Sequence, residues 1–225
     1  AIARELCRRG AQTLIIDVEE SETCAPTLHC DLADRDAVSG LAEQALARLG
    51  GVDILVNCAG IAYIAAVQDL DLDRYHRLLQ VNLHSPVTLM RDLSPGMIQA
   101  KYGRIVNITS VHAAVSEPGC LAYDAAKGAL AAATRTAALD LAPHGVLVNS
   151  VAPGFVATRM SIKDGEDELD SDWFRTVYVD GGQLPLGRAG QPDEIARLVG
   201  WLASPANTYM TGQAVTIDGG MAVRM

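Results

Sequence analysis

A serine, a tyrosine and a lysine stand at spacings that could carry out acid–base chemistry. Tyr123 and Lys127 are four residues apart in a predicted helix, so both side chains lie on one helix face. Because a nearby ammonium group favours the phenolate, we expect Lys127 to lower the pKa of Tyr123. Ser110 follows a predicted strand, where open α/β sheets place their sites, and its hydroxyl could bind a substrate oxygen. A Tyr–Lys pair alone is usually a solvated helix surface, and the ordered set of three is much more specific.

The elements that must position these residues alternate between apolar strands and helices. The predicted strands cover residues 13–17, 27–30, 52–57, 104–109, 146–151 and 214–217. The predicted helices cover residues 1–10, 34–49, 72–100 (broken near Ser85-Pro86), 122–142 and 195–203. This alternation predicts an α/β fold with a doubly wound, Rossmann-like parallel sheet and helices on both faces.

One stretch interrupts the alternation. Residues 160–186 are polar, acidic and without strong periodicity, which is typical of a functional lid. Because no linker or repeat is visible, we predict one domain over residues 1–225 with a lid or substrate loop at about 159–186. The acidic run in this lid favours a solvated surface and comprises Asp164, Glu166, Asp167, Glu168, Asp170 and Asp172.

The composition excludes several classes of protein. Hydrophobic residues make up 49% and charged residues 20% of the 225 residues, a balance that excludes a wholly disordered chain. A net charge of −9 argues against general nucleic-acid binding, and no apolar run is long enough for a membrane span. The five cysteines show no CxxC and no zinc spacing, so we expect free thiols, no metal and a cytoplasmic location.

The start of the chain is unusual for a nucleotide-binding sheet. Such sheets begin with a strand, a Gly-rich turn and a helix, and an acidic residue follows about 20 residues after the turn. Asp17 fits the acidic position, but counting back from it leads to a point just before Ala1. We therefore expect that the first strand and the phosphate-binding loop are missing; the alternative is a fold that begins with a helix. The strands ending at Asp17 and Asn57 should then carry unpaired edges, and the chain alone should be poorly stable and bind NAD weakly.

Over essentially its whole length the chain resembles the short-chain dehydrogenases/reductases. Asn57-Cys58-Ala59-Gly60 is similar to the family's NAG motif with Cys58 inserted, and the set Ser110, Tyr123 and Lys127 matches its catalytic serine and YxxxK. Other matches are Asn82, the segment 148–154 that ends in Pro-Gly, Thr158, Thr211-Gly212-Gln213 and Asp218-Gly219-Gly220. The departure is the absent TGxxxGxG turn.

The resemblance implies a role for each matching residue. Tyr123 would exchange a proton with the substrate oxygen, Ser110 would position that oxygen, and Lys127 would hold the nicotinamide ribose. Asn82 would hold a water that relays protons to Lys127. The cofactor-binding residues implied are Asp17, Asp31, Leu32, Asn57, Ala59, Gly60, Tyr123, Lys127, Pro153, Gly154, Val156 and Thr158. A homotetramer is also implied, and the Ala-rich helix at 122–142 fits a helix buried on more than one face.

The acidic residue after the first visible strand favours NAD over NADP. The carboxylate of Asp17 could accept hydrogen bonds from both adenosine ribose hydroxyls, whereas a 2′-phosphate would meet like charge there. Glu19 and Glu20 add to this repulsion, and Val18 offers no cation. Asp31 is equally well interpreted as an adenine contact or as a helix N-cap.

The substrate is less defined by the sequence. Candidate substrate-binding residues are His112, Glu117 and Phe155, with Trp173 and Tyr178 nearby in the lid, although a lone histidine is more often structural. No Lys or Arg cluster is present to bind a phosphopantetheine or sugar phosphate, which favours a sugar, a polyol or another secondary alcohol. The sequence thus predicts an NAD-dependent oxidoreductase that interconverts such an alcohol and a ketone. The alternatives are a 3-oxoacyl-carrier-protein reductase and a non-catalytic NAD-sensing module.

Overall fold

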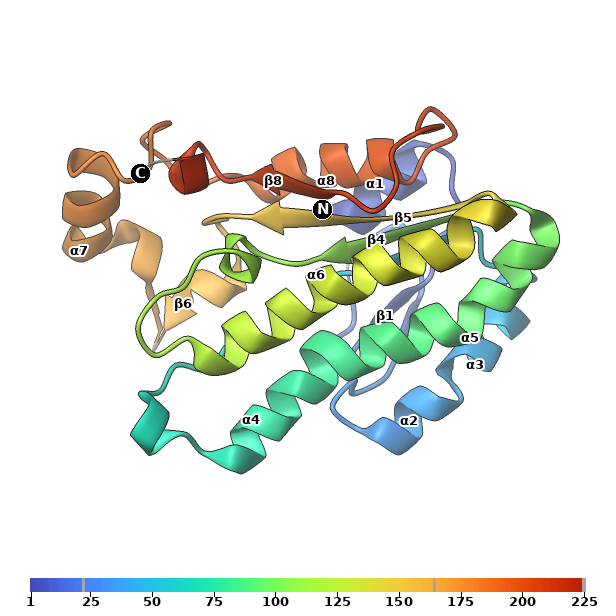
Figure 1. Ribbon diagram of the computed structural model, residues 1–225, viewed down its shortest axis with the longest axis horizontal. Coiled ribbons are helices and arrows are strands. Elements are labelled where there is room, and N and C mark those ends of the chain that lie inside the picture. Colours follow the sequence, from blue (N-terminus) through green and yellow to red (C-terminus); the bar gives the residue numbers. More distant parts are fainter. Residues whose placement is uncertain (22, 164, 224–225) are drawn as a thin grey trace.

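The computed structural model describes residues 1–21, 23–163 and 165–223, which form parallel β-structure with helices on both faces (Figure 1). A four-stranded parallel sheet has the order β3 (Ile54–Asn57), β4 (Gly103–Ile108), β5 (Val146–Pro153) and β8 (Ala214–Ile217). In the central register Leu55 pairs with Ile105, which pairs with Val148. The predicted fold class is confirmed.

Two apolar cores cover the faces of this sheet. Because successive strand residues face opposite sides, Ile105 and Val106 of β4 belong to different cores. The core around Ile105 contains side chains of α3 (Leu41–Leu49), α5 (Ser85–Ala100) and α6 (Leu121–Leu141). The core around Val106 contains side chains of α1 (Ile2–Arg8) and α8 (Pro192–Leu202).

A second, two-stranded sheet stands apart from the first. Its strands are β1 (Ile15–Asp17) and β2 (Thr27–His29), which pair in parallel with each other. Among the described residues no ladder joins β1 to β3, so one edge of each strand has no strand partner. The expectation of unpaired edges on the strands ending at Asp17 and Asn57 is confirmed.

A disulfide corrects the prediction that all cysteines are free thiols. Cys7 in α1 is bonded to Cys24, which lies between β1 and β2. The remaining described cysteines form no disulfide. The sequence spacing could not indicate this bond, because it depends on how α1 packs beside the β1–β2 connection. The argument from free thiols for a cytoplasmic location is correspondingly lost.

Two predicted helices differ in their interior. The helix predicted at 34–49 is divided at Gly40 into α2 (Arg35–Ser39) and α3, with the Asp34 carboxylate capping α2. The helix predicted at 72–100 is divided next to Ser85, as expected, but by a wider turn and not by a break in the chain of helical residues. Here α4 (Leu72–Leu79) widens into a π-helical turn at Gln80–His84, and α5 begins at Ser85. Pro86 has no N–H, so it cannot donate the usual helical hydrogen bond to the carbonyl of Asn82, four residues earlier. The loss of this hydrogen bond accounts for the wider turn.

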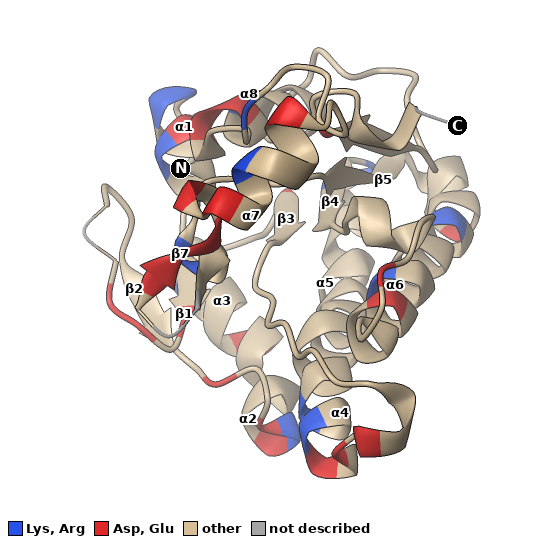
Figure 2. Ribbon diagram, turned by 90° about the vertical axis from the view of Figure 1, so that its left-hand side faces the viewer, with Lys and Arg blue, Asp and Glu red and all other residues tan. Residues whose placement is uncertain are grey.

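The lid contains short elements. An antiparallel pair, β6 (Ile162–Lys163) and β7 (Glu166–Asp167), is followed by a 3-10 turn at Glu168–Asp170, by α7 (Asp172–Phe174) and by a π-helical turn at Arg175–Asp180. Figure 2 shows acidic residues on β7 and around α7. Their side chains are exposed or half-buried, as predicted for a solvated surface, while Asp164 of the run lies outside the described residues. No helix in the described ranges has the length and apolar character to cross a membrane.

Candidate active site

Buried amides bring the ends of the central strands together. Asn57, the last residue of β3, donates a 2.8 Å hydrogen bond to the side-chain oxygen of Asn107 in β4. Asn107 in turn donates to the hydroxyl of Thr134 on α6, also at 2.8 Å. All three residues are buried, so each hydrogen bond prevents the desolvation cost of an unpaired polar group. These two hydrogen bonds hold α6, which carries Tyr123 and Lys127, against the strand that leads to Ser110.

Ser110, Tyr123 and Lys127 converge as the sequence predicted. Ser110 lies two residues after the end of β4, and its hydroxyl is close enough to that of Tyr123 to act on the pKa of the phenol. The ammonium nitrogen of Lys127 lies 5.6 Å from the centre of the Tyr123 ring and donates a 2.8 Å hydrogen bond to the carbonyl of Ile108. Ser110 and Lys127 are buried, whereas Tyr123 is half-buried. Ser110 and Tyr123 can hold one substrate oxygen, and Tyr123 can exchange a proton with it.

The predicted lowering of the tyrosine pKa is wrong for this structure. Burial raises the pKa of Tyr123, and the hydrogen bond from Ser110 opposes that shift only in part. Burial also lowers the pKa of Lys127 to about 8. The physical cause is the same in both, because a poorly solvated site disfavours the charged form of each group. At neutral pH Tyr123 is therefore a protonated acid beside a lysine that is still a cation.

Gly60 brings the backbone close to Lys127 and Asn82. A β-carbon at Gly60 would lie 3.4 Å from Oδ1 of Asn82 and 3.5 Å from the nitrogen of Lys127, in ordinary van der Waals contact with both. Asn82 accepts from the amide of Ile61 at 2.9 Å and donates to its carbonyl at 2.8 Å. Its side chain thus orders the loop after β3. The ammonium group of Lys127 could donate hydrogen bonds to the hydroxyls of a nicotinamide ribose, and the backbone of Gly60 would lie close to the same ribose.

Pro153 and Gly154 lie where β5 ends against the last strand. A β-carbon at Gly154 would approach Cβ of Asp218 to 2.8 Å, so only glycine fits without a shift. The amide of Gly154 donates to the carbonyl of Ile217 at 3.1 Å. Val156 then forms a bridge with Gly190, and the Thr158 side chain caps the following 3-10 turn. This segment leads from the carboxyl edge of the sheet into the lid.

The predicted adenosine-binding residues lie at the ends of the two strands of the smaller sheet. Asp17 ends β1, and its carboxylate accepts from the amide of Glu19 at 3.2 Å. Asp31 is not an N-cap, which corrects one of its two interpretations: Asp34 has that role, and Asp31 forms a 3.1 Å ion pair with Arg77. The backbone carbonyl of Leu32 accepts from the hydroxyl of Ser85 at 2.7 Å.

A cation near Asp17 escaped the sequence analysis. Arg159, at the start of the lid, forms an ion pair with Glu19, and Asp17 is close enough to contribute to the raised pKa of Arg159. The prediction had considered only Val18 as a source of positive charge. The two side chains are 140 positions apart, so only the fold brings them together.

Two predicted substrate residues contact the lid. Tyr178 donates a 2.6 Å hydrogen bond to the carboxylate of Glu117, and burial together with this carboxylate raises the pKa of Tyr178. Phe155 packs edge-on against Phe174 and Tyr178, with ring centres 5.0 and 4.7 Å apart. Trp173, also in the lid, packs against Tyr178 with 5.3 Å between the ring centres. Glu117 and Phe155 therefore join the lid to the body beside the site.

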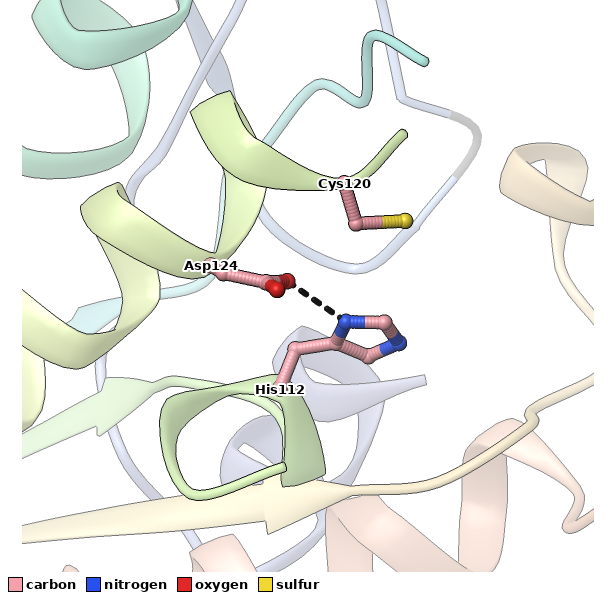
Figure 3. Close-up of side chains that lie close together, drawn as sticks. All are labelled: His112, Cys120 and Asp124. Atoms are coloured by element: carbon pink, nitrogen blue, oxygen red, sulfur yellow. Dashed lines mark hydrogen bonds and ion pairs between the residues drawn. The ribbon is translucent and has the colours of Figure 1, made fainter. Parts of the chain in front are cut away.

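His112, the remaining predicted substrate residue, lies beside Tyr123. Its Nδ1 forms a 2.6 Å hydrogen bond with Asp124, a residue that the sequence analysis missed (Figure 3). Cys120 is near enough for the three side chains to be considered as metal ligands, with all ligand atoms within 4.8 Å of one another. A proton already joins Nδ1 to the carboxylate, and ligands around one zinc ion would stand farther apart than 2.6 Å. The arrangement is therefore that of a hydrogen-bonded pair.

Comparison with known proteins decides the family. A family model described as enoyl-(acyl carrier protein) reductase matches residues 1–222. The chain belongs to the short-chain dehydrogenase/reductase family. Members of this family bind a nicotinamide cofactor, and this enzyme is an oxidoreductase acting on carbonyl and hydroxyl groups of small molecules.

Three relatives illustrate the breadth of this similarity. The short-chain reductase protein NovJ of Streptomyces niveus is 35% identical over 98% of this chain and 88% of its own length. The 3-oxoacyl-[acyl-carrier-protein] reductase FabG of Thermotoga maritima is 32% identical over 99% of this chain and 87% of its own. A gluconate 5-dehydrogenase from Burkholderia cenocepacia, solved with NADP and tartrate, is 30% identical with a TM-score of 0.88, covering 100% of this chain and 90% of its own.

Proposed function

We propose that the enzyme interconverts a secondary alcohol of a sugar, polyol or similar hydroxyl compound and the corresponding ketone, with NAD as cofactor. The observation that carries the proposal is the convergence of Ser110, Tyr123 and Lys127 at the carboxyl edge of the sheet. This set has no use in a protein that only senses NAD, because sensing needs no proton donor.

The chain's own residues supply orientation and the proton path. When bound, nicotinamide supplies a hydride at its C4 position. Tyr123 gives its proton to the carbonyl oxygen during reduction, and Ser110 holds the same oxygen. Lys127 binds the ribose hydroxyls and, as a cation, supports proton supply to Tyr123. Asn82 orders the loop of Gly60 through Ile61, and we assign the relay of a water to this π-helical turn.

The preference for NAD rests on the acidic end of β1. The carboxylate of Asp17 suits two ribose hydroxyls, and a 2′-phosphate would be repelled by it. Arg159 is the nearby cation that could offset this repulsion, but Glu19 is paired with it. We therefore place the adenosine ribose against Asp17, with Asp31 and Leu32 toward the adenine.

A 3-oxoacyl-carrier-protein reductase is the second candidate, favoured by the similarity to FabG of Thermotoga maritima. The gluconate 5-dehydrogenase supports the first candidate, since gluconate is a polyhydroxylated substrate, although that structure holds NADP. Among residues at the proposed pocket, His112, Glu117 and Phe155 provide a polar and aromatic lining. No cation is among them to bind a carrier phosphate.

We further propose that the enzyme is a homotetramer. Helix α6 buries one side in the molecule, yet Leu139 on its other side is 78% exposed. An exposed leucine on an Ala-rich helix is suited to a second contact, with another copy of the chain. Sedimentation equilibrium would measure the mass, and a Leu139→Glu variant should shift it toward smaller species.

The experiment that tests the proposed function measures turnover with both cofactors. NAD⁺ and NADP⁺ would be offered with a panel of sugars, polyols and secondary alcohols, and NADH and NADPH with a 3-oxoacyl thioester. We expect NAD-linked turnover of a hydroxyl compound, and a 10²–10⁴-fold loss in Tyr123→Phe with NAD binding retained. A preference for NADPH and the thioester would favour the second candidate. Normal turnover by Tyr123→Phe would refute the assigned proton donor.

A further inference from the structure

His112 and Asp124 form a hydrogen-bonded pair at the edge of the catalytic tyrosine. Nδ1 of His112 lies 2.6 Å from Oδ1 of Asp124, and the two side chains are only 15% and 16% exposed. The imidazole stands at 78° to the Tyr123 ring, with 5.6 Å between the ring centres. The pair therefore borders the place where the reacting oxygen of a substrate meets Tyr123.

The carboxylate determines which way the imidazole is used. An ionised carboxylate only accepts hydrogen bonds, so the proton in this contact belongs to Nδ1 of His112. In the neutral ring Nε2 then carries the lone pair and accepts a hydrogen bond. Figure 3 shows Nε2 pointing away from Asp124. In the neutral ring, the nitrogen of His112 that points away from Asp124 is thus an acceptor, suited to a hydroxyl group.

The backbone couples this acceptor to the catalytic serine. His112 and Ser110 share one tight turn at the end of β4, and the amide of His112 donates a 3.2 Å hydrogen bond to the Ser110 hydroxyl oxygen. The imidazole therefore lies beside both residues that would hold the carbonyl oxygen of a substrate. The substrate group nearest to that oxygen is one on the adjacent carbon.

We propose that His112, oriented by Asp124, binds a hydroxyl group on the carbon next to the reacting carbonyl, so that the preferred substrates are α-hydroxyketones and vicinal diols. This inference rests on the proposed function and narrows its substrate class. It also separates the two candidates chemically, because a 3-oxoacyl thioester has methylene groups on both sides of the reacting carbonyl. In this arrangement His112 touches the substrate, and Asp124 is a positioning residue.

The test compares two ketones that differ by one hydroxyl group. The ratio of kcat/KM for 3-hydroxy-2-butanone to that for 2-butanone measures what the hydroxyl contributes. The wild-type enzyme should favour the hydroxyketone, and His112→Leu should lower the ratio about tenfold, the effect of losing one hydrogen bond. Because both rates are measured on the same protein, a general loss of activity cancels in the ratio.

Two further variants and one control separate orientation from folding. Asp124→Ala should lower the ratio as His112→Leu does, whereas Asp124→Asn should restore part of it, because the amide oxygen still accepts from Nδ1. His144→Leu is the matched control, since His144 is exposed and lies beyond the far end of α6. The control should keep the wild-type ratio.

The outcomes distinguish this inference from the proposed function. An unchanged ratio in His112→Leu, or an equal loss for both ketones in His112→Leu and Asp124→Ala, would overturn the inference. A wild-type protein that reduces neither ketone would count against the proposed function. The inference about His112 would then be tested by ligand binding, followed through the imidazole nitrogen signals in ¹⁵N NMR spectra. The Nε2 signal of His112 is the one that is absent from the spectrum of His112→Leu. We expect its chemical shift to change when 2,3-butanediol is added and to stay the same when 2-butanol is added. A signal that stays in place with the diol would refute the role of His112.

Discussion

The four-stranded sheet and the β1–β2 pair differ in how their polar groups are satisfied. The larger sheet holds β4 between two parallel partners, and the buried amides of Asn57 and Asn107 connect it to α6. The smaller pair packs Ile16 and Leu28 against the core around Ile105 and is joined to α1 by the Cys7–Cys24 bond, but among the described strands β1 has no partner on the side of β3. The proposed catalytic set thus lies on the sheet with a strand on each side of β4, and the proposed adenosine site lies on the pair that, in the described part of the chain, lacks a strand on one side.

The largest expected difference between the two regions is in amide hydrogen exchange. Amides of β4 and β5 should exchange at least about a thousandfold more slowly than those of β1 and β2, because β4 and β5 are paired on both sides, whereas β1 and β2 share one three-residue ladder. Hydrogen exchange read by mass spectrometry or NMR would measure the ratio. Equal protection in both regions would show that the β1–β2 pair is as firmly held as the central sheet.

Removal of the disulfide should have the next largest effect. The bond closes a loop with a sequence separation of 17, and its loss from Cys7→Ser/Cys24→Ser should cost about 3 kcal/mol of unfolding free energy. Urea unfolding with and without a reductant would measure this cost. The double variant is its own control, because a reductant should not destabilise it further. A wild-type protein that is insensitive to reductant would exclude a stabilising disulfide.

The pH dependence of turnover should follow the two titrating groups of the proposed catalytic set. Burial lowers the pKa of Lys127 to about 8, so its charge is present below pH 8 and lost above it. The rate of carbonyl reduction should therefore fall about tenfold per pH unit above pH 8. The rate of alcohol oxidation should rise in the same range, because the raised pKa of Tyr123 means that the phenolate forms only at alkaline pH.

A profile of kcat/KM against pH in both directions would check this expectation. Lys127→Arg is the informative comparison, because a guanidinium stays charged and should remove the break near pH 8. Reduction that increases through pH 8 in the wild-type enzyme would contradict the assignment.

The smallest effect is expected at the contact between lid and body. Tyr178→Phe removes the hydrogen bond to Glu117 and should cost about 1 kcal/mol, seen as a lower melting temperature and a several-fold higher KM. Tyr209→Phe is the control, because Tyr209 is 98% exposed. Equal effects of the two substitutions would show that the contact does not hold the lid.

Much of the larger sheet could be predicted from local signals. The alternation of apolar strands and helices placed β3, β4, β5 and β8, and the Tyr123–Lys127 spacing predicted their common helix face. The split of the sheet beside β1 was also expected, since the acidic Asp17 position implied a strand between it and β3. These features depend on neighbouring residues or on sheet order, which a sequence pattern carries.

What the sequence by itself determined is the fold class, the family motifs and the common helix face of Tyr123 and Lys127, because periodicity and short spacings encode them. Only the tertiary structure decided the Cys7–Cys24 bond, the Glu117–Tyr178 contact and the pairing of His112 with Asp124. It also reversed the expected pKa shift of Tyr123, since burial raises this pKa more than the Ser110 hydroxyl lowers it. The physical reason is common to all four: contacts between separate elements and the loss of solvent arise only when the chain packs.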